Sequence, residues 1–294
     1  NLAQDYPEIR DINTVSSTLQ NLQMSGGTDF EKIESARKLN PSEYTLNAQL
    51  GYISLNSKLN ADQVLAVAYE YTVNGEVFTV GEFSNSAIAA PQTLIVKLIK
   101  GTSFTPSKKN WDLMMKNIYN IGAYQITRED FTVDILYTND KTGTDLTYIP
   151  AGAIDSIQLL RVMGLDNLNT NNDPYPDGMF DYVENFTISS SGGRIIFPVR
   201  EPFGSYLYDK ITGGNSALNN VADGYVFPEL YDSTKSKAQQ MAEKNKFKLK
   251  GRYKSNSSSE ISLNAINVPQ GSVSVTAGST LLVENVDYTV DYNL

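Results

Sequence analysis

Alternation of apolar and polar residues dominates the chain, and this two-residue period predicts β-strands. In the clearest run, alternate positions are apolar or aromatic and would lie on one face of a strand: Leu65, Val67, Tyr69, Tyr71 and Val73. Asn74-Gly75 follows, a pair favoured in type I′ turns because both residues tolerate positive φ. An apolar run then resumes at Val77. Residues 63–83 are therefore predicted to form a β-hairpin.

Further strands are predicted where similar runs recur: 130–137, 186–189, 194–199, 246–253, 260–265, 271–277 and 281–292. Residues 93–99 differ, because they are apolar on both faces apart from Lys97. Such two-sided apolar character is typical of a buried strand.

Helical signals are fewer. Thr28 and Glu31 have the spacing of a capping box, which predicts a helix through Leu39, ended by Asn40-Pro41. Thr105-Pro106 supplies a second helix start. Apolar residues at helical spacing follow it and predict an amphipathic helix over 106–121: Trp111, Met114, Met115, Ile118 and Ile121.

Two more helices are predicted, a short one over 154–163 that ends at Gly164 and a polar surface helix over 234–245. Because hairpins recur rather than strand-helix-strand units, the predicted fold is α+β and β-dominant. We expect sandwich-like antiparallel or mixed sheets with about three short peripheral helices.

Two β-rich modules are expected. The first, residues 1–150, holds the N-terminal helix, the hairpin 63–83 and the helix 106–121. The second, residues 151–294, holds an acidic turn at 166–181.

Composition limits the partners. The chain has 294 residues, 40% of them hydrophobic, so it can bury a core. Its net charge of -9 repels phosphate backbones, and the basic stretch 244–250 alternates like the wet face of a strand. Nucleic acid is therefore not an expected partner. No apolar run approaches the ~20 residues of a membrane helix. We also expect the chain to be a piece of a longer protein.

The sequence contains no histidine and no cysteine. This excludes Ser-His-Asp and Cys-His nucleophile systems, thiolate zinc sites and the iron facial triad. Nucleotide-binding glycine motifs are missing as well. Carboxylate-pair chemistry, as in glycosidases, is the main class left open, and nothing favours it. We therefore expect no enzymatic activity.

The acidic turn is the one candidate metal site. Calcium prefers oxygen ligands, and the turn offers several: Asp166, Asn169, Asn171, Asp173, Asp177 and Asp181. The spacing does not match an EF-hand loop. The alternative is that Asn, Asp, Pro and Gly serve here as ordinary turn formers. No other cofactor is expected.

Several longer strings of the sequence point in one direction. The first runs from Thr28 through Leu39 into Pro41-Ser42-Glu43-Tyr44 and then 50–55. The others are distributed along the rest of the chain: 64–72, 176–182, 193–199, 201–204, 207–212, 268–273 and 286–292. Together these strings resemble the SprA/Sov family, and the resemblance covers nearly the whole sequence.

The SprA/Sov family forms the giant outer-membrane translocon of the type IX secretion system in Bacteroidetes, which is linked to gliding motility. The resemblance implies a huge β-barrel with large soluble insertions. The predicted helices and long polar loops do not fit barrel strands. The resemblance therefore implies a soluble insertion in the extracellular cap, with a periplasmic position as the alternative.

The implied role is structural, with contacts to other parts of the same barrel, to secreted cargo proteins and to translocon accessory proteins. The resemblance brings no catalytic residues. A freestanding cell-surface adhesin or glycan-binding module is the alternative function, because an acidic, strand-rich surface protein would share this composition.

Overall fold

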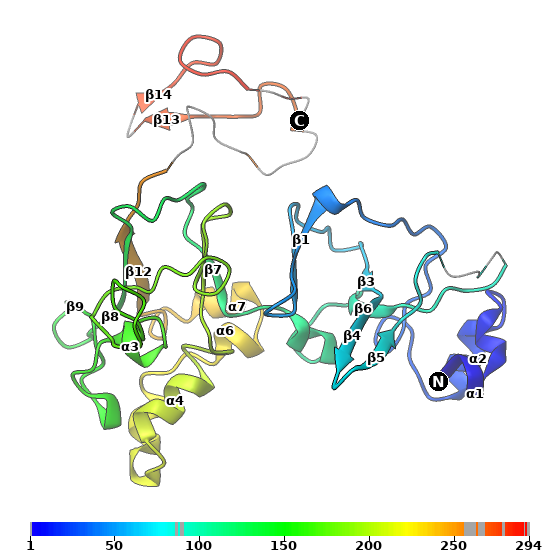
Figure 1. Ribbon diagram of the computed structural model, residues 1–294, viewed down its shortest axis with the longest axis horizontal. Helices are drawn as coiled ribbons and strands as arrows, with labels where there is room; N and C mark the ends of the chain where they lie inside the picture. The colour runs from blue at the N-terminus through cyan, green and yellow to red at the C-terminus, as the bar shows by residue number, and fades with distance from the viewer. Residues whose placement is uncertain are drawn as a thin grey trace. The chain divides into compact units, whose positions relative to one another are not determined.

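The computed structural model describes residues 2–85, 88, 91–255, 263, 268–277, 280–290 and 292 (Figure 1). The strand predicted over 260–265 lies outside these residues, apart from residue 263. In the described part of the chain, no helix has both the length and the apolar character needed to cross a membrane.

The chain divides into two compact units. The larger comprises Asn1–Lys38 and Asn60–Ser258, and the smaller comprises Leu39–Leu59 and Ser259–Leu294. The expected module boundary at residue 150 stays a prediction, and the core of the larger unit draws on residues from both sides of it.

The larger unit holds most of the regular elements. Its strands are β3 (Leu65–Val67), β4 (Tyr69–Val73), β5 (Glu76–Val80), β6 (Lys97–Lys100), β7 (Ile118–Asn120), β8 (Thr132–Thr138), β9 (Asp145–Leu146), β10 (Ile188–Ser189), β11 (Arg194–Ile196) and β12 (Phe247–Arg252). Its α-helices are α1 (Leu2–Asp5), α2 (Val15–Asn21), α3 (Leu159–Val162), α4 (Ser205–Thr212), α5 (Asn219–Asp223), α6 (Glu229–Asp232) and α7 (Lys235–Gln240). Its 3-10 helices are η1 (Pro7–Arg10), η3 (Lys109–Leu113), η4 (Gly152–Ile154) and η5 (Ser216–Leu218).

The smaller unit contains two hairpin-like pairs. Its elements are η2 (Pro41–Glu43), β1 (Tyr44–Asn47), β2 (Tyr52–Leu55), β13 (Thr276–Ala277) and β14 (Thr280–Leu281). β1 pairs with β2, and β13 pairs with β14.

Small antiparallel sheets make up the β structure of the described residues. The three-stranded sheets have the orders β12-β8-β9 and β10-β11-β7, and β3-β6 and β4-β5 are two-stranded. The predicted α+β, β-rich class is confirmed. Within the described residues there are seven α-helices, more than the three expected, because most are single turns that the apolar pattern does not mark.

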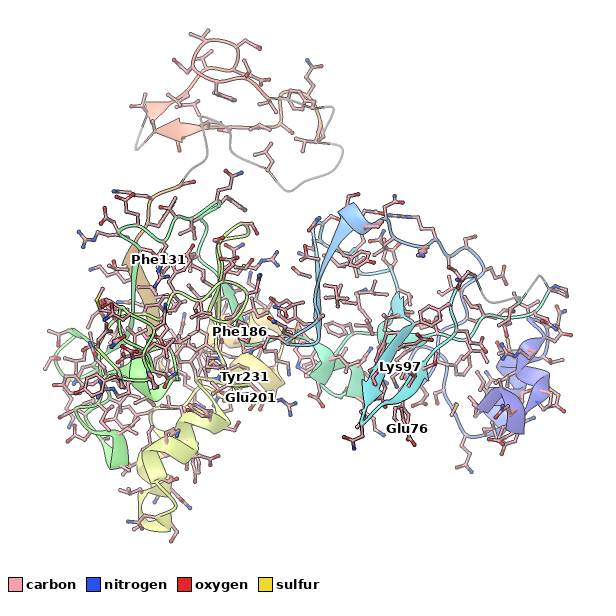
Figure 2. All side chains as sticks on the ribbon, in the orientation of Figure 1. Glu76, Lys97, Phe131, Phe186, Glu201 and Tyr231 are labelled. Atoms are coloured by element: carbon pink, nitrogen blue, oxygen red, sulfur yellow. The ribbon has the colours of Figure 1, made fainter. Side chains whose placement is uncertain are left out.

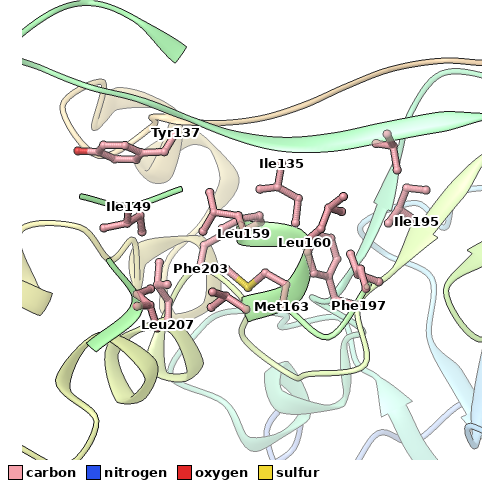
Figure 3. Packing of buried hydrophobic residues seen from close by; sticks show 14 of the residues in the cluster. Ile135, Tyr137, Ile149, Leu159, Leu160, Met163, Ile195, Phe197, Phe203 and Leu207 are labelled. Carbon is pink, nitrogen blue, oxygen red and sulfur yellow. The ribbon is translucent and has the colours of Figure 1, made fainter. Parts of the chain in front are cut away.

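One hydrophobic core organises the larger unit (Figure 3). Ile135 and Tyr137 of β8 face Leu159 of α3, which is 0% exposed. Alternate residues of a strand point to the same face, so the predicted period of two in residues 130–137 places these side chains in the core. Full burial of each such aliphatic side chain contributes about 1.5–3 kcal/mol.

The predicted hairpin is confirmed over β4 and β5. Asn74 and Gly75 have φ values of 52° and 87°, as a type I′ turn requires, and Val73 pairs with Glu76. The hairpin is shorter than residues 63–83, because β3 leaves it to pair with β6. The expectation of a buried strand over 93–99 is wrong, since Leu94 and Val96 are 41% and 39% exposed.

The helix predicted over 28–39 is wrong. Instead of capping a helix, the Glu31 carboxylate accepts hydrogen bonds from the backbone N–H and the hydroxyl of Thr102, at 2.7 and 2.6 Å. The Thr28 hydroxyl accepts from Nζ of Lys108 at 2.6 Å. Both capping groups are therefore used by a segment distant in sequence.

The amphipathic helix predicted over 106–121 is also wrong. Only η3 forms, and Ile118–Asn120 becomes β7, which pairs with β11. Trp111 is buried, and its indole N–H donates to the carbonyl oxygen of Tyr231 at 2.6 Å (Figure 2 labels Tyr231). Pairing with β11 satisfies backbone groups that a helix would have satisfied internally.

Two smaller predictions have mixed outcomes. The helix over 154–163 reduces to η4 and the single turn α3. The polar surface helix predicted over 234–245 is confirmed in part as α7. Thr234 caps it by accepting a hydrogen bond from the backbone N–H of Lys237 at 3.3 Å.

Candidate functional site

The acidic turn is closed by two aspartates, each of which binds the backbone on the opposite side. Oδ1 of Asp166 accepts from the backbone N–H groups of Asp177 and Gly178, at 2.9 and 3.1 Å. The Asp181 carboxylate accepts from those of Asn167 and Leu168, at 2.7 and 3.2 Å. These reciprocal bonds hold the start and the end of the turn together.

The tip of the turn is organised by Asn169. Its side-chain oxygen accepts from the backbone N–H groups of Asn171 and Asp173, both at 2.9 Å. Its amide nitrogen donates to Oδ2 of Asp173 at 3.1 Å. Asn171 and Asp173 are exposed. The side chains therefore perform the backbone-bonding role of turn formers.

The two aspartates at the base of the turn, Asp166 and Asp181, are buried. Asp166 is 0% exposed, and its Oδ2 lies 3.4 Å from Nε of Arg161 but accepts no hydrogen bond from the described residues. Burial raises the pKa of Asp181, and the charges of Asp166 and Asp177 add to this effect. The two backbone N–H bonds to Asp181 act in the opposite direction.

The turn brings Asp166, Asp177 and Asp181 to one end of the loop, whereas Asn169, Asn171 and Asp173 form its tip. Among the residues that the structure describes, no group of three or more carboxylates is arranged to hold a metal ion. Calcium binding at this turn stays a prediction from the sequence.

A groove of about 800 Å³ lies between the acidic turn and the paired ends of β8 and β12. One wall comes from the turn and the other from the segments that flank the two strands. Its lining includes Arg128, Phe131, Asp177, Phe180, Arg252 and Tyr253. Figure 2 labels Phe131, immediately before β8.

Aromatic rings build the base of this groove. The Phe131 ring packs edge-on against Phe180 and Tyr182, with centroids 5.5 and 5.4 Å away. The Tyr182 hydroxyl donates to the carbonyl oxygen of Ile126 at 2.9 Å. Edge-to-face pairs of this kind add about 0.5–1.5 kcal/mol beyond area burial, so they fix the base of the groove.

Charges of both signs line the rim. Nζ of Lys254 lies 2.5 Å from Asp130 and 3.5 Å from Glu129, and hydrogen bonding to Lys254 lowers the pKa of Asp130. Arg128 and Arg252 are exposed and form no ion pair with any described residue. The groove therefore presents two guanidinium groups that form no ion pair with a described residue, although the charge of Arg252 also helps to lower the pKa of Asp130.

The sequence pattern identified only the turn side of the groove. Alternation placed Phe131 in a predicted strand, but nothing local connected it with Arg128 or Arg252, because the three residues come to line one groove only through the antiparallel pairing of β8 with β12. The alternation of residues 246–253 marked Arg252 as a polar strand position, but no spacing rule connects that position to Arg128.

No protein-family model matches the chain, and no curated protein matches it significantly.

Proposed function

We propose that this chain is a non-enzymatic, partner-contacting part of an outer-membrane protein-export translocon of the type IX secretion system. It lies in the extracellular cap and contacts the rest of the barrel, secreted cargo or accessory proteins. The resemblance to the SprA/Sov family supports this proposal, because its strings extend from Thr28 to Tyr292.

One observation carries the contact role. The groove presents exposed apolar and cationic side chains, including Met179, Arg252 and Tyr253, beside a turn that is held closed from within. A fixed wall with exposed aromatic and arginine side chains is typical of protein recognition surfaces.

The carboxylates of the groove favour contact over glycoside hydrolysis. Asp181 binds two backbone N–H groups, Asp130 pairs with Lys254, and Oδ1 of Asp177 accepts from the N–H of Met179 at 3.0 Å. A glycosidase needs one carboxyl group to donate a proton and another to act on the sugar. Here these carboxylates have structural partners instead.

Epitope labelling in the source bacterium tests this function. We would insert a short epitope after Lys141, in the exposed turn between β8 and β9, within the full-length parent protein. The proposal expects the tagged protein in the outer-membrane fraction, antibody binding on intact cells, and loss of type IX cargo from the medium when the parent protein is depleted.

Two results would overturn the proposal. Cargo secretion that continues at the normal level after depletion would remove the export role. Recovery of the tagged protein as a freestanding surface protein that binds glycans would favour an adhesin.

A further inference from the structure

The groove holds two arginines with unused hydrogen-bonding capacity. A guanidinium group offers five N–H donors in a planar fork that matches a carboxylate. Neither Arg128 nor Arg252 has an ion-pair partner among the described residues, whereas the neighbouring Lys254 is paired with Asp130. Lys254 is thus paired within the groove, whereas the N–H groups of Arg128 and Arg252 can bind an external anion, and Asp130 lies close enough to Arg252 to be affected by its charge.

Apolar side chains adjoin these arginines. Met179 and Tyr253 are 51% and 50% exposed, although both line a concave surface whose base is formed by Phe131 and Phe180. Covering them would remove apolar surface from water, which favours binding. A ligand suited to the groove thus carries both an anionic and an apolar group.

We propose that this groove binds an extended segment of a partner polypeptide in which acidic side chains alternate with apolar ones. Its carboxylate pairs with Arg128 and Arg252, and its apolar side chain covers Met179 and Tyr253. The inference rests on the partner-contact role given above, and it names the chemistry of that partner. A volume of about 800 Å³ lies within the range of known ligand sites, so the groove has room for part of an extended segment.

The charges of the groove favour an acidic peptide over a nucleic acid or a neutral oligosaccharide as its ligand. A nucleic acid would bring a continuous row of phosphates against Asp177 and Asp181, on a chain with a net charge of -9. A neutral oligosaccharide would leave both guanidinium groups without an anion. An acidic peptide of alternating pattern places one of its carboxylates at the arginines and its apolar side chains over Met179 and Tyr253.

Peptide binding to the 294-residue chain tests the proposal. The probe is a fluorescein-labelled, C-amidated heptapeptide in which glutamate alternates with phenylalanine, and its counterpart has glutamine at each glutamate position. Fluorescence anisotropy measures the dissociation constants. We expect the glutamate peptide to bind at least about tenfold more tightly than the glutamine peptide, since a carboxylate forms charge-assisted bonds to arginine.

Matched variants locate the binding. Arg128→Gln and Arg252→Gln should each weaken binding of the glutamate peptide by about tenfold. Lys250→Gln is the control, because Lys250 lies exposed on the same strand as Arg252 but outside the groove. It removes the same charge and should leave binding unchanged. Circular dichroism melts would verify that all three variants fold.

Three outcomes would overturn the inference: no binding of the glutamate peptide, equal binding of both peptides, or equal losses in Lys250→Gln and Arg252→Gln. Binding of cellohexaose or chitohexaose in place of the peptide would assign the groove to glycans instead. The export assay is independent. Specific peptide binding with normal export would overturn only the translocon role, and an export defect without peptide binding would overturn only this inference.

Discussion

Replacement of Gly193 by alanine probes how the turn between β10 and β11 is held against its neighbour. Gly193 has a φ of 57°, and an added Cβ would lie 1.6 Å from the carbonyl oxygen of Ala123. Gly143, in the turn between β8 and β9, has a φ of 68° but no heavy atom within 4 Å of such a Cβ. The two glycines share a backbone conformation and differ in the space around them.

The structure gives a different cost for each substitution. Alanine in the left-handed region costs about 1 kcal/mol at either site. At Gly193 the turn must also move, and this movement breaks two hydrogen bonds that the turn accepts. The N–H of Ile121 donates to the carbonyl oxygen of Gly193 at 2.9 Å, and the N–H of Ile126 donates to that of Ser190 at 3.1 Å. Each bond contributes about 1 kcal/mol. We expect Gly193→Ala to lower the free energy of unfolding by about 3 kcal/mol and Gly143→Ala by about 1 kcal/mol.

Urea unfolding followed by tryptophan fluorescence measures both effects, because Trp111 is the single tryptophan and is buried. The dependence of the unfolding free energy on urea should stay the same in all three proteins, so that midpoints compare stability directly. Equal destabilisation by the two substitutions would refute the reasoning, because the close approach to Ala123 would then have no energetic consequence.

Three further predictions concern the larger unit. Hydrogen bonds from Arg10 hold the pKa of Glu82 below its ordinary value of 4.5, so this pair stabilises the fold above that pH and the contribution is lost as the pH falls through the lowered pKa. Acid titration of the unfolding free energy should therefore show a smaller drop below pH 4.5 in Glu82→Gln than in the parent chain. Lys100 donates to the carbonyl oxygens of residues 60, 61 and 63, at 3.1, 3.0 and 2.6 Å. Lys100→Met should therefore lower the free energy of unfolding in urea by about 1–2 kcal/mol and speed proteolysis of the loop 60–63. Leu159→Ala should lower the free energy of unfolding by about 2–5 kcal/mol, because Leu159 is 0% exposed. Leu113 is 50% exposed, and a loss of stability in Leu159→Ala as small as that in Leu113→Ala would contradict the assignment of Leu159 to the core.

The sequence determined the elements whose causes are local. Asn74-Gly75 forms its turn because the two residues accept positive φ, and Thr234 caps α7 with its own hydroxyl. The alternation in residues 130–137 specified β8 and the side that enters the core, because side-chain direction in a strand follows from the backbone alone. For the acidic turn the sequence left calcium binding and ordinary turn formation as alternatives, and the structure shows side chains of the turn that accept hydrogen bonds from its own backbone.

Tertiary structure decided the rest. Glu31 had the right spacing to cap a helix, but the N–H of Thr102 offered its carboxylate another partner. Ile118 had helical spacing, yet β11 supplied backbone partners that favoured a strand. The groove depends most on tertiary structure, because Arg128 and Arg252 line it together only when β12 pairs with β8. Local patterns state which conformations a segment can adopt, and contacts between distant segments select among them, because each buried polar group must find a partner somewhere in the fold.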